Sequence, residues 1–322
     1  MSAEAGMPGT PAWRPPGPAL LFCPADRPER YSKALDRSDA VILDLEDAVA
    51  PENRESARAS LRSAAAGLDS DRYLVRLNAV DTPDFVADAA AAREMGASAV
   101  MLAKTESGDD VRRAAAESGA AVLALVETPL GVVRAAEIAA APGCAGMMWG
   151  AEDLVAAMGG ATSRFQPEEA ELGRRVDGYR DVPRHARSAV ALAAAAFDRF
   201  AVDSVHLDIG DVSGLRAEAV DAVALGYAAT ACIHPSQVEV IRAAYAPPAA
   251  EIAWAEKVLA SAESEGGVFR LDGRMVDGPV IAQARATMRR AGASSGAGGN
   301  GGNGGTHDTG GTGAAAAPGE TN

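Results

Sequence analysis

Acidic side chains follow apolar runs at several points along this chain of 322 residues. The clearest case is the stretch 121–153, AVLALVETPLGVVRAAEIAAAPGCAGMMWGAED, which reads as strand, turn, helix, turn and strand. Glu127 closes the first of its strands and Asp153 closes the second, with Glu152 beside it. Paired carboxylates at the ends of parallel strands offer the oxygen ligands that a hard cation such as Mg²⁺ requires. The stretch therefore predicts Glu127 and Asp153 as magnesium ligands.

Polar residues gather at the ends of the other predicted strands as well. Like charges in one mouth repel each other, so we expect a cation among these acids. Any single acid could instead cap the next helix or pair with a base on a neighbouring strand. The predicted strand-end residues are Asp44, Glu46, Asp47, Arg76, Asn78, Lys104, Glu106, Glu127, Glu152, Asp153, Asp208, Asp211 and His234.

Three of these side chains have two readings each. Arg76 could form a structural ion pair, or its planar fork could clamp a substrate carboxylate beside the metal. Lys104 could be a Schiff-base nucleophile, but surrounding acids would raise its pKa and disfavour that role. His234 is either a hydrogen-bonded structural histidine, which we favour, or a base.

The elements that must position these residues form a repeating series of strand and helix. Eight such units indicate a parallel sheet with helices on its faces, and their number favours an α/β (β/α)₈ TIM barrel. No GxGxxG motif follows the first strand, which argues against a dinucleotide-binding open sheet. The predicted strands are 19–25, 40–49, 73–80, 98–107, two within 121–153, 203–211 and 229–235, and the longest stretch without a strand is 154–200.

Composition divides the chain into four parts. Residues 1–18 are rich in Pro and Gly and are predicted to be disordered, and residues 19–247 form the barrel. Residues 248–291 form a C-terminal capping extension with a helix from Ala249, a hairpin-like piece and a second helix. Residues 292–322 form a Gly-rich tail that contains too little apolar surface to fold.

Bulk properties exclude several classes of function. The formal net charge of −14 argues against a nucleic-acid partner. No run of about 18 apolar residues or signal peptide is evident, so we expect a cytoplasmic protein without a membrane partner. Cys23, Cys144 and Cys232 have no metal-ligand spacing, which suits buried thiols in a reducing compartment.

Several motifs in order along residues 19–291 resemble the CitE-like branch of the HpcH/HpaI aldolase family, which includes citrate lyase β subunits and malyl-CoA and citramalyl-CoA lyases. The resemblance implies a Mg²⁺-binding TIM barrel in which Glu127 and Asp153 hold the metal. The motifs are LFCPADRPERYSKAL, VILDLEDAV, VRLNAVDTP, MLAKTES, VETPLGV, WGAEDL, HLDIGDVSGL and IHPSQVEVI.

The resemblance also implies roles for residues outside the metal pair. Arg76 would bind the substrate carboxylate and take part in catalysis. Asp44 and Glu46, at the end of their predicted strand, are further candidates for substrate binding beside Glu127 and Asp153. The chain would form a homotrimer or a higher homo-oligomer. Asp277, in the motif GRMVD, would reach a neighbour's site as the catalytic acid or base.

Basic residues after the first strand are candidates for binding coenzyme A. Arg27, Arg30 and Lys33 are spaced three apart and so share one side of a helix. They could bind the CoA phosphates or form a solvated helix face.

The predicted activity is Mg²⁺-dependent cleavage of a carbon–carbon bond in a 3-hydroxyacyl-CoA, such as malyl-CoA or citramalyl-CoA. The products are an acyl-CoA and a 2-keto acid, and the reverse reaction is their condensation. The alternatives are a citrate lyase β subunit acting on citryl-acyl-carrier protein, a malyl-CoA thioesterase and a catalytically silent binding barrel. Three departures from the family pattern leave the substrate open. Ala103 precedes Lys104 where proline is usual, Ala229–Thr230 replace a glycine–lysine pair, and the region after Asp153 is longer.

Overall fold

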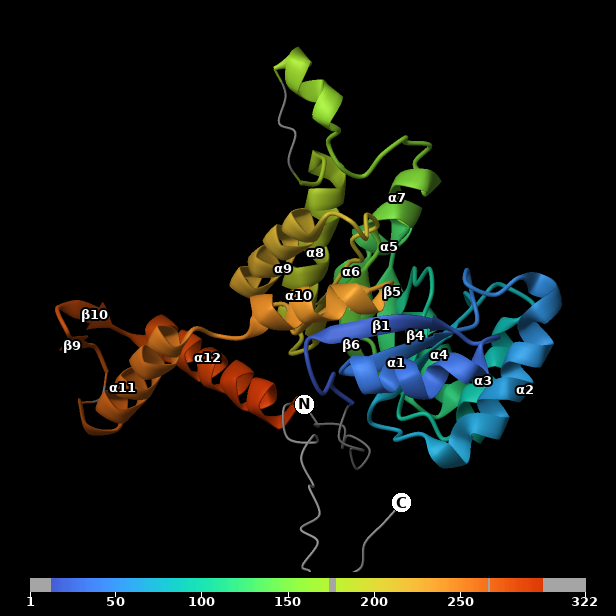
Figure 1. Ribbon diagram of the computed structural model, residues 1–322, viewed down its shortest axis with the longest axis horizontal. Helices are drawn as coiled ribbons and strands as arrows, with labels where there is room; N and C mark the ends of the chain where they lie inside the picture. Colours follow the sequence, from blue (N-terminus) through green and yellow to red (C-terminus); the bar gives the residue numbers. More distant parts are fainter. Residues whose placement is uncertain (1–12, 174–177, 266, 298–322) are drawn as a thin grey trace, which may run out of the picture.

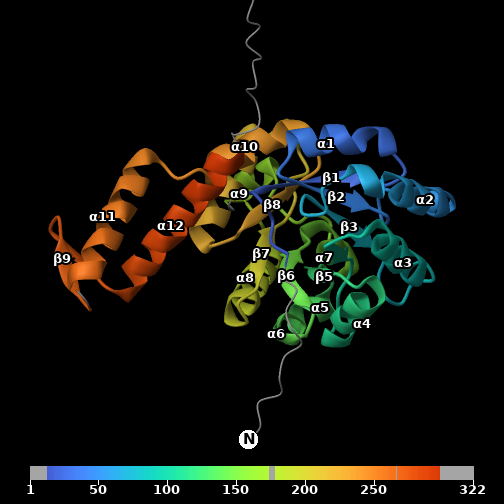
Figure 2. The same cartoon turned by 90° about the horizontal axis from the view of Figure 1, so that it is seen from below.

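The chain forms a closed barrel of eight parallel strands in sequence order (Figures 1 and 2). The computed structural model describes residues 13–173, 178–265 and 267–297. Strand β1 pairs with both β2 and β8, which closes the sheet and confirms the predicted TIM barrel. The strands are β1 Ala19–Pro24, β2 Ala40–Asp44, β3 Tyr73–Leu77, β4 Ala99–Leu102, β5 Ala121–Val126, β6 Cys144–Trp149, β7 Phe200–Asp203 and β8 Ala229–Cys232.

Helices surround the barrel as a single outer layer (Figure 2). They are α1 Tyr31–Arg37, α2 Arg54–Ala64, α3 Phe85–Met95, α4 Gly108–Ser118, α5 Pro129–Val133, α6 Ala135–Ala140, α7 Ala151–Ala157, α8 Asp181–Ala196, α9 Val212–Leu225 and α10 Pro235–Tyr245. Short 3₁₀ helices lie at η1 Pro28–Arg30, η2 Pro51–Asn53, η3 Ala65–Gly67 and η4 Pro167–Leu172. No helix in these described ranges is long and apolar enough to cross a membrane.

Two layers of apolar side chains hold the barrel together. Alternate strand residues such as Leu20, Ile42 and Leu74 fill the interior, while their neighbours pack outward against the helices. Trp13 closes one side of the interior cluster, because its ring meets Phe200 edge-on at a centroid distance of 5.9 Å. The inward residues are mostly aliphatic, so the barrel is a solid core and leaves only its mouth for chemistry.

Several predicted boundaries were wrong, and the strands predicted at 40–49 and 98–107 end earlier, at Asp44 and Leu102. Residues 13–18 are ordered, because Trp13 is buried and its Nε1 donates to the carbonyl of Asp71 at 3.0 Å; residues 1–12 lie outside the described part. Strand β7 spans Phe200–Asp203 and not 203–211. Asp153 lies in the first turn of α7 and does not end a strand, because the helix begins directly after Gly150. The last helix continues to residue 297 into the predicted tail.

The C-terminal extension is a helical hairpin with a small sheet at its tip. It consists of α11 Ala249–Glu265, β9 Phe269–Leu271, β10 Arg274–Val276 and α12 Gly278–Ala297, as the sequence predicted. Asp272 and Gly273 both have positive φ, which suits the tight turn between the two strands. The extension has its own apolar cluster and projects away from the barrel, with β9 and β10 at the far end (Figures 1 and 2).

Packing between β6 and β7 depends on the absence of a side chain at Gly146. A Cβ at this position would lie 2.4 Å from two ring carbons of Phe200. We expect Gly146→Ala to lower the free energy of unfolding by about 1–3 kcal/mol, measured by urea denaturation, because overpacking forces the ring or the strand to move. Gly67→Ala is the matched control, since nothing lies within 4 Å of its Cβ position. Equal unfolding midpoints for the two variants would contradict this account.

Candidate active site

A cavity of about 420 Å³ opens at the carboxyl end of the barrel. Its polar lining comes from the turn after β2, from β3, from the residue after β5 and from the first turn of α7, while Phe22, Leu125 and Met148 form an apolar floor. A second, larger groove between α5 and α8 is lined almost entirely by apolar side chains. The charged groups that line the mouth cavity are Asp44, Asp47, Arg76, Glu127, Glu152 and Asp153.

Arg76 is held by two acids, one at the end of β2 and one in the turn that follows it. Its Nε and Nη2 donate to the two carboxylate oxygens of Asp44 at 2.7 and 2.6 Å, and its Nη1 lies 2.9 Å from Glu46 Oε2. The guanidinium also lies over the ring of Phe22, 5.1 Å from its centroid. Burial lowers the pKa of Arg76, but Asp44 outweighs this effect and keeps the group charged. Two of its five N–H groups donate to Asp44, and Arg76 also lines the cavity.

Glu127 directly follows β5 and is almost completely buried. Its Oε1 accepts a hydrogen bond from the backbone N–H of Lys104 at 3.0 Å. Gly150 leaves room for the other oxygen, since a Cβ there would lie 2.7 Å from Glu127 Oε2. Burial, and then the charge of Asp153, raises the pKa of Glu127 to about 8. An acid in this state needs a nearby cation in order to stay ionised.

Lys104 crosses the rim of the cavity between acids from two sides of the barrel. Its Nζ contacts Glu46 and lies 3.5 Å from Asp153 Oδ1, and its backbone adopts a positive φ of 49°. Burial lowers the pKa of Lys104, but Glu46 outweighs this effect and raises it above the usual range. A lysine that stays protonated is a poor Schiff-base nucleophile, so the structure favours an ion-pairing role.

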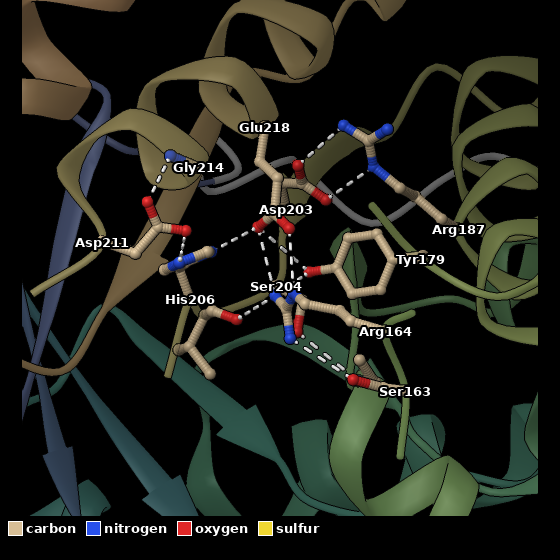
Figure 3. A network of polar contacts seen from close by, with 12 residues as sticks. Ser163, Arg164, Tyr179, Arg187, Asp203, Ser204, His206, Asp211, Gly214 and Glu218 are labelled. Atoms are coloured by element: carbon tan, nitrogen blue, oxygen red, sulfur yellow. Dashed lines mark hydrogen bonds and ion pairs between the residues drawn. The ribbon is translucent and has the colours of Figure 1, made fainter. Parts of the chain in front are cut away.

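Glu152 is committed to a different network. Its Oε1 accepts hydrogen bonds from Ser163 Oγ at 2.6 Å and from Arg164 Nη1 at 2.9 Å. Arg164 also contacts Glu218 of α9 and Tyr179, and the carboxylate of Glu218 contacts His206 as well (Figure 3). The segment between α7 and α8 is thereby tied to α7 and α9. The sequence did not predict this network, because its contacts join residues up to 54 positions apart.

Two predicted site residues serve as helix caps. Asp211 accepts from the backbone N–H of Gly214 at the start of α9, and His234 accepts from that of Ser236 at the start of α10. The structural reading of His234 is therefore supported. Asp208 is exposed, and its carboxylate accepts from the backbone N–H of Gly210.

The remaining predicted residues do not line the cavity within this chain. Arg27, Arg30 and Lys33 are exposed beyond the carboxyl end of β1, the strand that supplies Phe22 and Pro24 to the cavity. Asp277 lies between β10 and α12 and accepts from the backbone N–H of Val280 at 3.3 Å. That position is on the projecting extension, away from the barrel (Figure 1).

The donor set at the mouth fits a divalent hard cation. Glu127 and Asp153 come from adjacent parts of the barrel, both line the cavity, and the negative charge of Asp153 raises the pKa of Glu127. Among the described residues, no cluster of three or more His, Cys, Asp or Glu side chains is arranged to hold a metal. A two-carboxylate site is open, and Mg²⁺ commonly completes such a site with water and substrate oxygens.

Comparison with known proteins assigns this arrangement to a family. Residues 19–235 match the model of the HpcH/HpaI aldolase/citrate lyase family. The chain belongs to that family. Residues 182–294 also match a model described as a C–C bond lyase of the TIM-barrel fold. The prediction of a carbon–carbon lyase is therefore confirmed at the level of the family.

The relatives of this chain within the family differ in the activity that their names describe. A citrate lyase subunit beta-like protein of Mycobacterium tuberculosis is 51% identical over 88% of this chain and 98% of its own length. A crystal structure of the CitE protein of the same species, in complex with magnesium, acetoacetate and coenzyme A, has a TM-score of 0.75 and 51% identity, covering 86% of this chain and 98% of that chain. A (3S)-malyl-CoA thioesterase of Cereibacter sphaeroides is 34% identical, covering 85% and 94%.

Glu127 should make the stability of the metal-free chain depend on pH. The pKa of this group is about 8 in the folded chain against an ordinary value of 4.5, so the folded chain keeps a proton that the unfolded chain releases between these values. Stability then falls as the pH rises through this window. We expect Glu127→Gln to be more stable than wild type at pH 8.5, by on the order of a few kcal/mol, and equally stable near pH 4.5.

The measurement is urea denaturation in buffer with a chelator at both pH values. Glu117→Gln, on the exposed side of α4, is the control and should show no such pH-dependent gain. A Glu127→Gln variant that gains no stability at the higher pH would refute the assigned environment of this carboxyl group.

Proposed function

We propose that this chain is a Mg²⁺-dependent lyase that cleaves a 3-hydroxyacyl-CoA, such as malyl-CoA or citramalyl-CoA, to an acyl-CoA and a 2-keto acid, or catalyses the reverse condensation. One observation carries the proposal. A buried, acid-anchored arginine and an acid pair suited to a divalent cation line a single cavity of about 420 Å³. A 2-keto acid has a carboxylate for the arginine and adjacent oxygens for the cation.

The residues divide the work as follows. Arg76 binds the carboxylate of the keto-acid portion with N–H groups that do not donate to Asp44, and Asp44 and Glu46 keep it in place. Glu127 and Asp153 would hold Mg²⁺, which supplies Lewis-acid polarisation of the oxygen on the reacting carbon. Phe22, Leu125 and Met148 provide an apolar floor that accommodates the carbon skeleton.

The chemistry requires one proton to leave and one to return. In the cleavage direction the hydroxyl group loses its proton, the adjacent carbon–carbon bond breaks, and its electron pair forms the enolate of the acyl thioester. Protonation of that enolate gives the acyl-CoA. Lys104 stays protonated beside Asp153 and stabilises negative charge at the rim.

The CoA portion of the substrate would extend over the carboxyl end of β1. Arg27, Arg30 and Lys33 are exposed there and offer charges for its phosphates. The CoA complex of the 51% identical CitE protein supports a thioester ligand.

Asp277 is the proposed acid or base for the enolate, acting from a neighbouring copy in a homotrimer or a higher homo-oligomer. Its place on the projecting extension, outside the cavity of its own chain, supports action in trans (Figure 2). The role requires that the partner's extension reach this mouth.

Thioester hydrolysis is a second candidate, since the (3S)-malyl-CoA thioesterase relative is 34% identical over most of both chains. Hydrolysis of malyl-CoA yields malate and free CoA, whereas cleavage yields a keto acid and acetyl-CoA. Action on citryl-acyl-carrier protein would instead require a companion carrier protein.

The lyase proposal predicts that purified protein with Mg²⁺ releases a keto acid from at least one of malyl-CoA, citramalyl-CoA and methylmalyl-CoA. A coupled assay measures the keto acid, and mass spectrometry identifies the products. Asp153→Ala should abolish the metal-dependent reaction, and we expect Arg76→Lys to lower kcat/KM by about 10²-fold or more, because lysine cannot offer a planar fork. Glu117→Gln should retain wild-type rates. Free CoA and a hydroxy acid as sole products would favour hydrolysis, and no turnover of any thioester would refute both activities.

Action of Asp277 in trans predicts complementation between inactive variants. We expect Asp277→Ala and Glu127→Ala to be nearly inactive alone, yet to recover part of the activity when co-refolded, because some mixed sites combine an intact Asp277 with an intact Glu127. Co-refolded Asp153→Ala and Glu127→Ala is the control. This mixture should recover no activity, because the metal pair of every chain lacks one of its two acids. Full activity of Asp277→Ala would rule out the role.

A further inference from the structure

Asn78 links the end of β3 to the turn after β2 and to α3, and it does not line the cavity. The residue is 2% exposed and lies two positions beyond Arg76. Its Nδ2 donates to the carbonyl oxygen of Leu45 at 3.0 Å. Leu45 stands between Asp44 and Glu46, the two acids that hold Arg76. Asn78 therefore fixes the backbone that carries both acids.

Asp88 of α3 holds Asn78 from behind. Its carboxylate is completely buried, and Oδ2 accepts from both the Nδ2 and the backbone N–H of Asn78, at 2.7 and 3.0 Å. Its Oδ1 accepts from Arg58 Nε of α2 at 2.7 Å. A buried carboxylate is tolerated only when it is paired and hydrogen-bonded, and Arg58 supplies the opposite charge.

The turn transmits this restraint to Arg76. Asp44 accepts from the backbone N–H groups of Glu46 and Ala48 at 2.9 and 3.2 Å, so its carboxylate orientation follows the turn. The same two oxygens accept from Arg76 at 2.7 and 2.6 Å. A shift of the turn must therefore move the guanidinium, because its main anchor moves with the backbone.

We infer that Asn78 and Asp88 are positioning residues for the keto-acid carboxylate, acting through the turn and Arg76. Neither side chain lines the cavity, and the hydrogen bonds described above connect both to the turn that holds Arg76. The inference rests on the proposed function in one respect, that Arg76 binds the substrate carboxylate.

The kinetic test uses the Mg²⁺-loaded enzyme in the condensation direction with acetyl-CoA and a 2-keto acid. Asn78→Ala should raise KM for the keto acid about 10- to 100-fold, while KM for acetyl-CoA changes less than two-fold, because only the carboxylate clamp is displaced. Asp88→Asn keeps the volume of the side chain and should shift KM in the same direction by a smaller factor. Asp88→Asn also tests the inference by itself if Asn78→Ala does not fold.

Tyr227→Phe is the matched control for loss of a buried hydrogen bond. Tyr227 Oη donates to the carbonyl of Arg187 at 2.8 Å, and neither residue lines the cavity. This variant should lower the melting temperature without changing either KM. If Asn78→Ala and Asp88→Asn behave like Tyr227→Phe, their role is only structural and the inference is overturned.

A crystal structure of the Asn78→Ala or Asp88→Asn variant decides the inference independently of turnover. We expect the turn after β2 and the guanidinium of Arg76 to be displaced relative to the wild-type crystal structure. An Arg76 that keeps its wild-type position overturns the inference, whatever the kinetics show. A wild-type enzyme without activity on any thioester refutes the proposed function alone, because the position of Arg76 can still be compared.

Discussion

An excess of buried negative charge at the barrel mouth is the constraint on which the rest of the site depends. Asp44, Glu46 and Glu127 are almost fully buried there, and Asp153 lies near Glu127. Carboxylates removed from water stay ionised only when cations or hydrogen-bond donors compensate them. Arg76 satisfies the first two acids, and Lys104 bridges Glu46 to Asp153. Glu127 retains a raised pKa, which marks the place where further positive charge would stabilise the folded chain most.

The barrel makes this concentration of charge possible because it brings the carboxyl ends of all strands to one mouth. The register between β2 and β3 places Asp44 opposite Arg76, so a contact between residues 32 apart in sequence follows from strand pairing alone. Helices on the outside then stabilise the turns. Arg58 on α2 bonds Asp88 on α3, Asp88 bonds Asn78, and Asn78 donates to the Leu45 carbonyl between the two acids. Support for the turn after β2 thus extends from the outer helices to the mouth.

The sequence was sufficient for the parts of the site that depend on strand ends. Asp44, Arg76 and Glu127 could be predicted because a buried parallel strand is an apolar run, and its last residues must lie at the mouth. Strand β7 was misplaced because the alternating residues after Asp203 imitate a half-buried strand. Trp13 was missed because its neighbours are rich in Pro and Gly. The Arg164 network depends on side-chain contacts across long separations, which no local pattern encodes.

The site has a buried half and an exposed half, and the exposed half leaves the predicted metal ligand Asp153 open to water. Arg76 and Glu127 are buried and tightly bonded, whereas the side chains of Asp153 and Lys104 are 38% and 36% exposed. Leu207 and Ile233 expose apolar surface on the same rim. An enolate must be kept from bulk water, and open carboxylate ligands bind weakly unless the remaining positions are filled. In the proposed reaction, the substrate's thioester arm or a second chain would provide this closure, because the extension of the same chain points away from the barrel.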